Sequence, residues 1–157
     1  RAPRRPVAPP PPGWPRRGQV QLQEVVLRYT PGARPALDGV SFNVLPGRHV
    51  GVCGRTGAGK SSILVALTRL HALEAGRILV DGMDARLLPV GALRAAIAVI
   101  PQEPFLFEGT VRENLDPEGR HADVDLCAVL RRCHVASAVE ALAPPGGEPA
   151  LVRGLGA

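Results

Sequence analysis

The chain has 157 residues, of which 45% are hydrophobic and 3% aromatic, and it carries a formal net charge of +5. This length allows one domain with an aliphatic core. No apolar run is close to the length of about 18 residues that a membrane-spanning helix needs. The charge does not indicate nucleic-acid binding, because five of its arginines lie within the first 17 residues and no basic stripe interleaved with aromatic residues follows.

Residues 1–18 are rich in proline and arginine, which predicts an extended or disordered linker. From Val20 the pattern changes, and alternating or β-branched residues predict strands over residues 20–29 and over Val40–Val44. The short apolar run His49–Cys53 predicts a buried strand. Ser61–His71 then predicts a helix with an apolar face. That face comprises Ile63, Leu64, Leu67 and Leu70.

Five further elements are expected in the rest of the chain. They are a strand over 77–80, a short helix over 89–96, a buried strand over 96–100, and helices over 124–134 and 135–142. A turn at 108–110 precedes the last two helices. A β-rich first half followed by strand, loop and helix predicts an α/β fold in which a sheet wraps around one helix.

Residues 54–62 read GRTGAGKSS and satisfy the phosphate-loop pattern G-x-x-x-x-G-K-S/T between an apolar run and an amphipathic helix. Glycines allow consecutive N–H groups to face phosphate oxygens, and the helix start adds its positive end. Lys60 is the only lysine, and its compact charge can sit between β- and γ-phosphates where a planar guanidinium cannot. The Ser61 hydroxyl is the expected Mg²⁺ ligand. The predicted loop residues are Gly54, Arg55, Thr56, Gly57, Ala58, Gly59, Lys60, Ser61 and Ser62.

Three further features accompany the loop. Tyr29 lies 31 residues before Lys60, Gln102 lies 42 residues after it, and IPQEPFLFEGTVRENLDP surrounds that glutamine. Together they resemble the nucleotide-binding domain of ATP-binding cassette (ABC) transporters over about residues 14–142, in particular the second such domain of subfamily C, the multidrug-resistance-associated proteins. Other phosphate-loop families fit less well, because a Ras-type GTPase needs another lysine and small-molecule kinases carry the loop near the N-terminus.

The resemblance implies a P-loop NTPase fold with an antiparallel β subdomain. The linker would cover 1–18, the domain 19–143, and a divergent tail 144–157. Tyr29 would stack on the adenine of ATP, and Gln102 would act in catalysis by reaching Mg²⁺ and the attacking water. An ordinary tyrosine at a strand end and a solvent-facing loop glutamine are the alternatives.

The resemblance also implies partners and a location. Transmembrane domains would contact the Gln102–Phe107 region, and a second nucleotide-binding domain would pair head to tail. The domain would lie at the cytoplasmic face of a membrane, within an integral transporter that couples ATP hydrolysis to export. Phe105 and Phe107 would either belong to that contact surface or pack into a local core.

The likeness fades after Leu142, and no LSGGQ-type signature, Walker B strand or switch histidine is found. The domain is therefore expected to be incomplete at its C-terminus, with one side of helix 61–71 uncovered. Because no general base is identifiable, this chain alone is expected to bind nucleotide without turnover. A non-catalytic nucleotide- or partner-binding module and an unstable truncated product are the alternatives.

Overall fold

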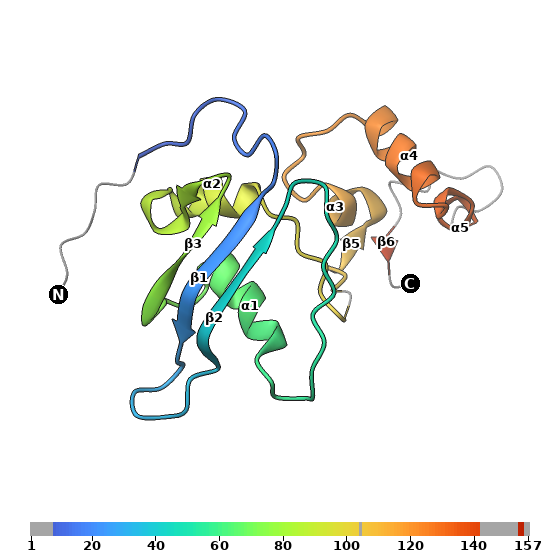
Figure 1. The fold of residues 1–157 in the computed structure, drawn as a ribbon. Helices are drawn as coiled ribbons and strands as arrows, with labels where there is room; N and C mark the ends of the chain where they lie inside the picture. Colours follow the sequence, from blue (N-terminus) through green and yellow to red (C-terminus); the bar gives the residue numbers. More distant parts are fainter. Residues whose placement is uncertain (1–7, 104, 142–153, 156–157) are drawn as a thin grey trace. The chain divides into compact units, whose positions relative to one another are not determined.

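A computed structural model describes residues 8–103, 105–141 and 154–155. The chain divides into two compact units, residues 1–99 and residues 100–157. The first unit contains a four-stranded antiparallel sheet in the order β2-β1-β3-β4 (Figure 1). This mixed α/β fold with an antiparallel sheet is the one that the sequence predicts.

Strand β1 (Val20–Leu27) lies inside the sheet, between β2 (Leu37–Val44) and β3 (Ala75–Val80). Its first residue, Val20, is opposite Val44 in β2 and Val80 in β3. A tight turn leads from β3 into the short strand β4 (Met83–Asp84). The strands expected at the positions of β1, β2 and β3 are thus confirmed, although β2 begins three residues earlier than expected.

One core holds this unit together. Helix α1 (Lys60–Leu67), the 3₁₀ helix η1 (Ala85–Leu87) and helix α2 (Val90–Ala95) all contribute to it, and α2 agrees with the predicted short helix. The largest fully buried side chains are Leu22, Val25, Leu27, Ile78, Leu88 and Leu93. Burying each such side chain stabilises the fold by about 1.5–3 kcal/mol, so this core fixes α1 against the β1–β2 hairpin.

The predicted apolar face of the first helix is confirmed for Ile63 and Leu67, which pack against the core, and is wrong for Leu64 and Leu70. The buried residues of α1 are Ser62 and Ala66, whereas Leu64 and Leu70 are 46% and 67% exposed. Residues four apart share a helix face, and these two small side chains let the helix approach the core closely. The helix also ends at Leu67, before the expected His71, because Arg69 adopts a left-handed φ of 51°.

Two predicted buried strands are absent from the described residues. His49–Cys53 has no regular structure and is exposed, with Val52 at 50%. Residues 97–100 are likewise irregular, and Ile100 is 92% exposed. A strand exists only where a neighbour takes up its hydrogen bonds, and neither run is paired here. Apolar composition alone therefore gives the wrong result for these two segments.

The N-terminal segment is irregular, as expected, but residues 8–18 are attached to the sheet. Trp14 packs against the core, and its indole Nε1 donates to the Val80 carbonyl at 3.2 Å. Main-chain N–H groups nearby donate to the Asp81 carboxylate at 2.7–2.8 Å, an arrangement that we call the Asp81 clip. Its donors are Arg16, Arg17 and Gln19. The expectation for residues 1–18 was an extended or disordered linker; residues 8–18 are irregular but hydrogen-bonded to the sheet, and residues 1–7 lie outside the described residues.

The second unit is small. Strand β5 (Gly109–Thr110) pairs with β6 (Gly154–Leu155), and α3 (Val111–Leu115) begins with a capping box between Thr110 and Glu113. Helices α4 (Asp123–Arg132) and α5 (Ala136–Glu140) confirm the two helices expected here. The core of this unit contains Val111 and Leu130. Leu142 and, apart from β6, the tail over 144–157 lie outside the described residues.

Candidate functional site

The glycine-rich loop leads directly into α1. Gly59 is the N-cap of this helix and has a φ of 87°. A Cβ atom at Gly59 would lie only 2.2 Å from the carbonyl oxygen of Ala36, so no other residue fits without displacing the main chain. The turn before it is closed by the Ala58 N–H, which donates to the Arg55 carbonyl at 3.1 Å. Residues 54–58 are exposed and therefore accessible to a ligand.

The only lysine is folded back onto this loop. Its Nζ donates to the carbonyl oxygens of Gly54 at 2.7 Å and of Arg55 at 2.8 Å. An anion that approached the loop would meet this ammonium group together with the positive end of α1. The neighbouring Ser61 at the first turn of the helix is exposed, whereas Ser62 is buried with an exposed fraction of 7%.

Tyr29 follows β1 and lies beside α1. Its hydroxyl donates to Ser62 Oγ at 3.0 Å, and 51% of the residue is exposed. Its ring meets the imidazole of His71 edge to face, with ring centroids 5.3 Å apart and an interplanar angle of 71°. The structure therefore brings Tyr29 and the loop residues together in the first unit. His71 is a neighbour that the sequence analysis did not select.

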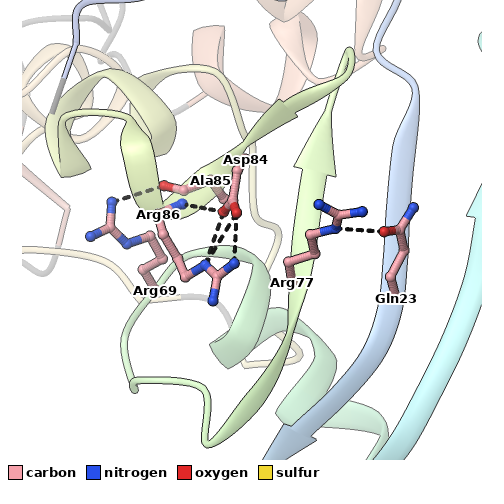
Figure 2. Close-up of polar contacts among 6 residues, drawn as sticks. All are labelled: Gln23, Arg69, Arg77, Asp84, Ala85 and Arg86. Atoms are coloured by element: carbon pink, nitrogen blue, oxygen red, sulfur yellow. Dashed lines mark hydrogen bonds and ion pairs between the residues drawn. The ribbon is translucent and has the colours of Figure 1, made fainter. Parts of the chain in front are cut away.

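The position of His71 depends on the turn that ends α1. Arg69 Nη1 donates to the carbonyls of Ala85 at 2.9 Å and Leu88 at 2.7 Å, which ties this turn to η1. Figure 2 shows the first of these bonds with two other arginine contacts of the sheet, Arg86 with Asp84 and Arg77 with Gln23. His71 and Tyr29 are distant in the sequence and belong to different segments, so no local sequence pattern indicated this contact.

Gln102 belongs to the second unit, where its side chain is exposed. Phe105 and Phe107 pack edge to face on each other, with centroids 5.1 Å apart, and are 75% and 55% exposed. Asn114 of α3 holds this segment, because it accepts from the Phe107 N–H at 2.7 Å and donates to the Phe107 carbonyl at 2.9 Å. The alternative in which both phenylalanines pack into a local core is therefore wrong. Residue 104 lies outside the description.

Comparison with known proteins decides the family. A family model described as ABC transporter matches residues 37–144. The chain belongs to the ABC transporter family. Human ATP-binding cassette sub-family C member 10 is 51% identical over 87% of the chain and 9% of its own length. Arabidopsis thaliana ABC transporter C family member 13 is 48% identical over 89% of the chain and 10% of its own.

A solved structure agrees with these relatives. A bacterial Atm1-family ABC exporter with ATP bound matches with a TM-score of 0.79 and 31% identity, over 89% of this chain and 24% of that one. The ABC domain fold and the resemblance to subfamily C are thus confirmed, and the human relative is member ten of that subfamily. This ABC chain spans about a tenth of the length of the curated relatives named above. Among its described residues, no helix is long and apolar enough to cross a membrane.

Proposed function

We propose that this chain is the ATP-binding portion of an ABC exporter, in which ATP binding and hydrolysis by the complete protein drive transport across a membrane. The observation that carries the proposal is the loop at the start of α1, where Lys60 Nζ is held by the carbonyls of Gly54 and Arg55. Family membership supports it. The half-exposed ring of Tyr29 beside the same helix supplies a surface on which adenine can stack.

The loop residues 54–62 would bind the phosphates, and Ser61 and Gln102 would address Mg²⁺. Magnesium bound with a nucleotide needs only one or two protein ligands, because phosphates and water supply the rest. The described residues contain no group of three His, Cys, Asp or Glu side chains that could hold a metal by itself. The exposed hydroxyl of Ser61 fits an ion that arrives with the nucleotide. Gln102 would also reach the attacking water in catalysis.

The partners follow from the same proposal. Transmembrane domains would meet the Gln102–Phe107 region, where the exposed Phe105–Phe107 pair offers an apolar contact fixed by Asn114. A second nucleotide-binding domain would pair head to tail. The chain would then work at the cytoplasmic face of the membrane. The second candidate is a module that binds nucleotide or a partner without turnover. The exposed pair would serve partner binding in either candidate, and the lack of an identifiable general base in this sequence favours the second.

The test is a thermal melt of the chain with and without MgATP. A ligand at a hundred times its dissociation constant stabilises the folded state by about 2.7 kcal/mol, which raises Tm by roughly 5–11 °C at this size. Lys60→Ala should abolish the shift. Lys60→Arg should also reduce it, since the guanidinium does not fit the loop. An equal Tm shift in wild type and Lys60→Ala would refute the phosphate-loop assignment. Release of phosphate from ATP by the chain would refute the expectation that it binds nucleotide without hydrolysing it.

A further inference from the structure

A cavity of about 560 Å³ lies between the N-terminal segment and the turn that joins β3 to β4. Its lining contains no residue of the loop 54–62 and includes the apolar residues Pro11, Trp14 and Met83 and the basic residues Arg16 and Arg17. Small-molecule sites have volumes of roughly 300–1,000 Å³ and combine apolar walls with a few polar groups. We propose that this cavity binds a small aromatic anion, whose ring packs on Trp14 and whose acidic group pairs with the two arginines.

The apolar wall of the cavity is already held in place without a ligand. Trp14 packs against the core of the first unit, and its Nε1 donates to the Val80 carbonyl at 3.2 Å. The main-chain N–H of Trp14 donates to the Pro11 carbonyl at 3.1 Å, and Met83 of β4 packs against the same core. An aromatic ligand therefore meets an indole ring of fixed orientation, so little further ordering opposes binding. Aromatic rings also pack favourably on one another and against a thioether sulfur.

The basic side chains at the cavity are available to a ligand because the Asp81 clip uses main-chain groups only. The N–H groups of Arg16 and Arg17 donate to Asp81, whereas their guanidinium groups take no part in the clip. One N–H of the Arg16 guanidinium donates to the Pro12 carbonyl at 3.3 Å. In the part of the chain that the structure describes, the Arg17 guanidinium forms no ion pair. Both arginines are exposed, and each guanidinium carries five donors that suit an oxyanion.

The Asp81 carboxylate lines the same cavity but does not cancel this attraction. Its Oδ2 accepts the N–H groups of Arg16 and Arg17, and its Oδ1 accepts that of Gln19, at 2.7–2.8 Å. Hydrogen bonds from main-chain donors stabilise the negative charge of a carboxylate and weaken its repulsion of a second anion. Two guanidinium groups against one carboxylate leave the lining with a net positive charge, which favours an anion over a cation.

The experiment follows the indole N–H signal of the chain labelled with ¹⁵N-tryptophan. Trp14 is the only tryptophan, so this NMR signal reports the cavity directly. The probe is naphthalene-2-sulfonate, an aromatic anion of about 14 non-hydrogen atoms, and it should shift the signal saturably with a dissociation constant of roughly 1 mM or lower. Inorganic sulfate, which lacks the ring, and 2-naphthol, which lacks the charge at neutral pH, should each bind more weakly.

Arginine variants test the charged part of the site. Arg17→Gln should weaken naphthalene-2-sulfonate roughly 2- to 5-fold, the value of one exposed ion pair, and leave the affinity for 2-naphthol unchanged. Adding Arg16→Gln should weaken the sulfonate further by a similar factor. Because the clip uses main-chain groups, both variants should melt like the wild type. Arg34→Gln, at an exposed arginine between β1 and β2 that does not line the cavity, removes the same charge and is the matched control.

Several outcomes would overturn the inference. The absence of a saturable shift up to about 10 mM naphthalene-2-sulfonate would mean that the cavity does not bind an aromatic anion. Equal binding of sulfate would remove the role of the ring, and equal binding of 2-naphthol would remove that of the arginines. Equal losses in Arg17→Gln and Arg34→Gln would indicate a general effect of net charge.

The phosphate loop supplies the last control. Lys60→Ala should keep the wild-type affinity for naphthalene-2-sulfonate, because this lysine does not line the cavity. A loss of binding in Lys60→Ala would place the probe at the phosphate loop and overturn the inference. The inference does not depend on the function proposed above, so failure of the wild type to bind MgATP would refute that function alone.

Discussion

Gly57 and Gly59 form a matched pair for testing how the loop is held. Both have a left-handed φ, 81° and 87°, so an alanine at either position meets the same backbone penalty of roughly 1–2 kcal/mol. Their surroundings differ. A Cβ atom at Gly57 has no neighbour within 4 Å, whereas one at Gly59 lies 2.2 Å from the carbonyl oxygen of Ala36.

The structure gives the size of the required movement. Real Cβ atoms do not approach within 3.0 Å of such an atom, so Gly59→Ala must separate the start of α1 from Ala36 by at least about 0.8 Å. Ala36 is itself hydrogen-bonded, because its N–H donates to the Leu27 carbonyl at 2.8 Å. Moving Ala36 therefore also strains the connection between β1 and β2. Overpacking that shifts main chain costs about 1–3 kcal/mol, and this is the expected difference between the two alanine variants.

Thermal unfolding followed by far-ultraviolet circular dichroism measures this difference. For a chain of this size it corresponds to a Tm that is roughly 2–12 °C lower in Gly59→Ala than in Gly57→Ala. Gly82→Ala, with a φ of 79° and open space around the Cβ position, serves as the control and should behave like Gly57→Ala. Equal Tm values for all three variants would refute the conclusion that the contact with Ala36 fixes the loop.

Three other predictions concern catalysis, acid stability and the core. Gln102→Ala should leave MgATP affinity within about twofold of wild type, and a loss as large as that of Lys60→Ala would contradict its assigned role. The main-chain N–H of Arg17, followed by those of its neighbours, holds the pKa of Asp81 below its ordinary value. The stability from Asp81 is therefore complete above the unfolded pKa of about 3.9 and is lost as pH falls through the folded pKa. Asp81→Asn should flatten the decline of Tm below about pH 4, and an unchanged slope would contradict the clip. Leu88→Ala, in the centre of the core, should lower the free energy of unfolding by about 2–5 kcal/mol in urea titration, whereas a loss under about 1 kcal/mol would show a site that collapses freely.

The sequence predicted those elements whose pattern is local. The three longer strands of the sheet show period-two or β-branched patterns, and α2 begins after Pro89 at its N-cap. The assignment of 54–62 as a phosphate loop rests on residue types and spacing that phosphate chemistry requires, and it stays a prediction. The contacts of this loop were not predictable, since the approach of Ala36 to Gly59 depends on packing between two segments that are distant in the sequence.

The errors share one physical cause. His49–Cys53 is apolar enough for a strand, but strand formation requires a pairing neighbour, which a local pattern does not reveal. The face of α1 was assigned correctly for Ile63 and Leu67 only, because the small residues Ser62 and Ala66, rather than Leu64, are the ones buried against the core. His71 reaches Tyr29 only because Arg69 turns the chain after the helix. Each of these features is decided by tertiary contacts.

The Asp81 clip has a consequence for sequence variation. All three of its donors are main-chain N–H groups, so the side chains at positions 16, 17 and 19 take no part in it. Any residue except proline can supply such a donor. Seven of the first 15 residues are proline, and none follows at 16, 17 or 19. Related chains can therefore exchange charge and size freely at these three positions and keep the attachment, provided that the proline-rich run stops before them.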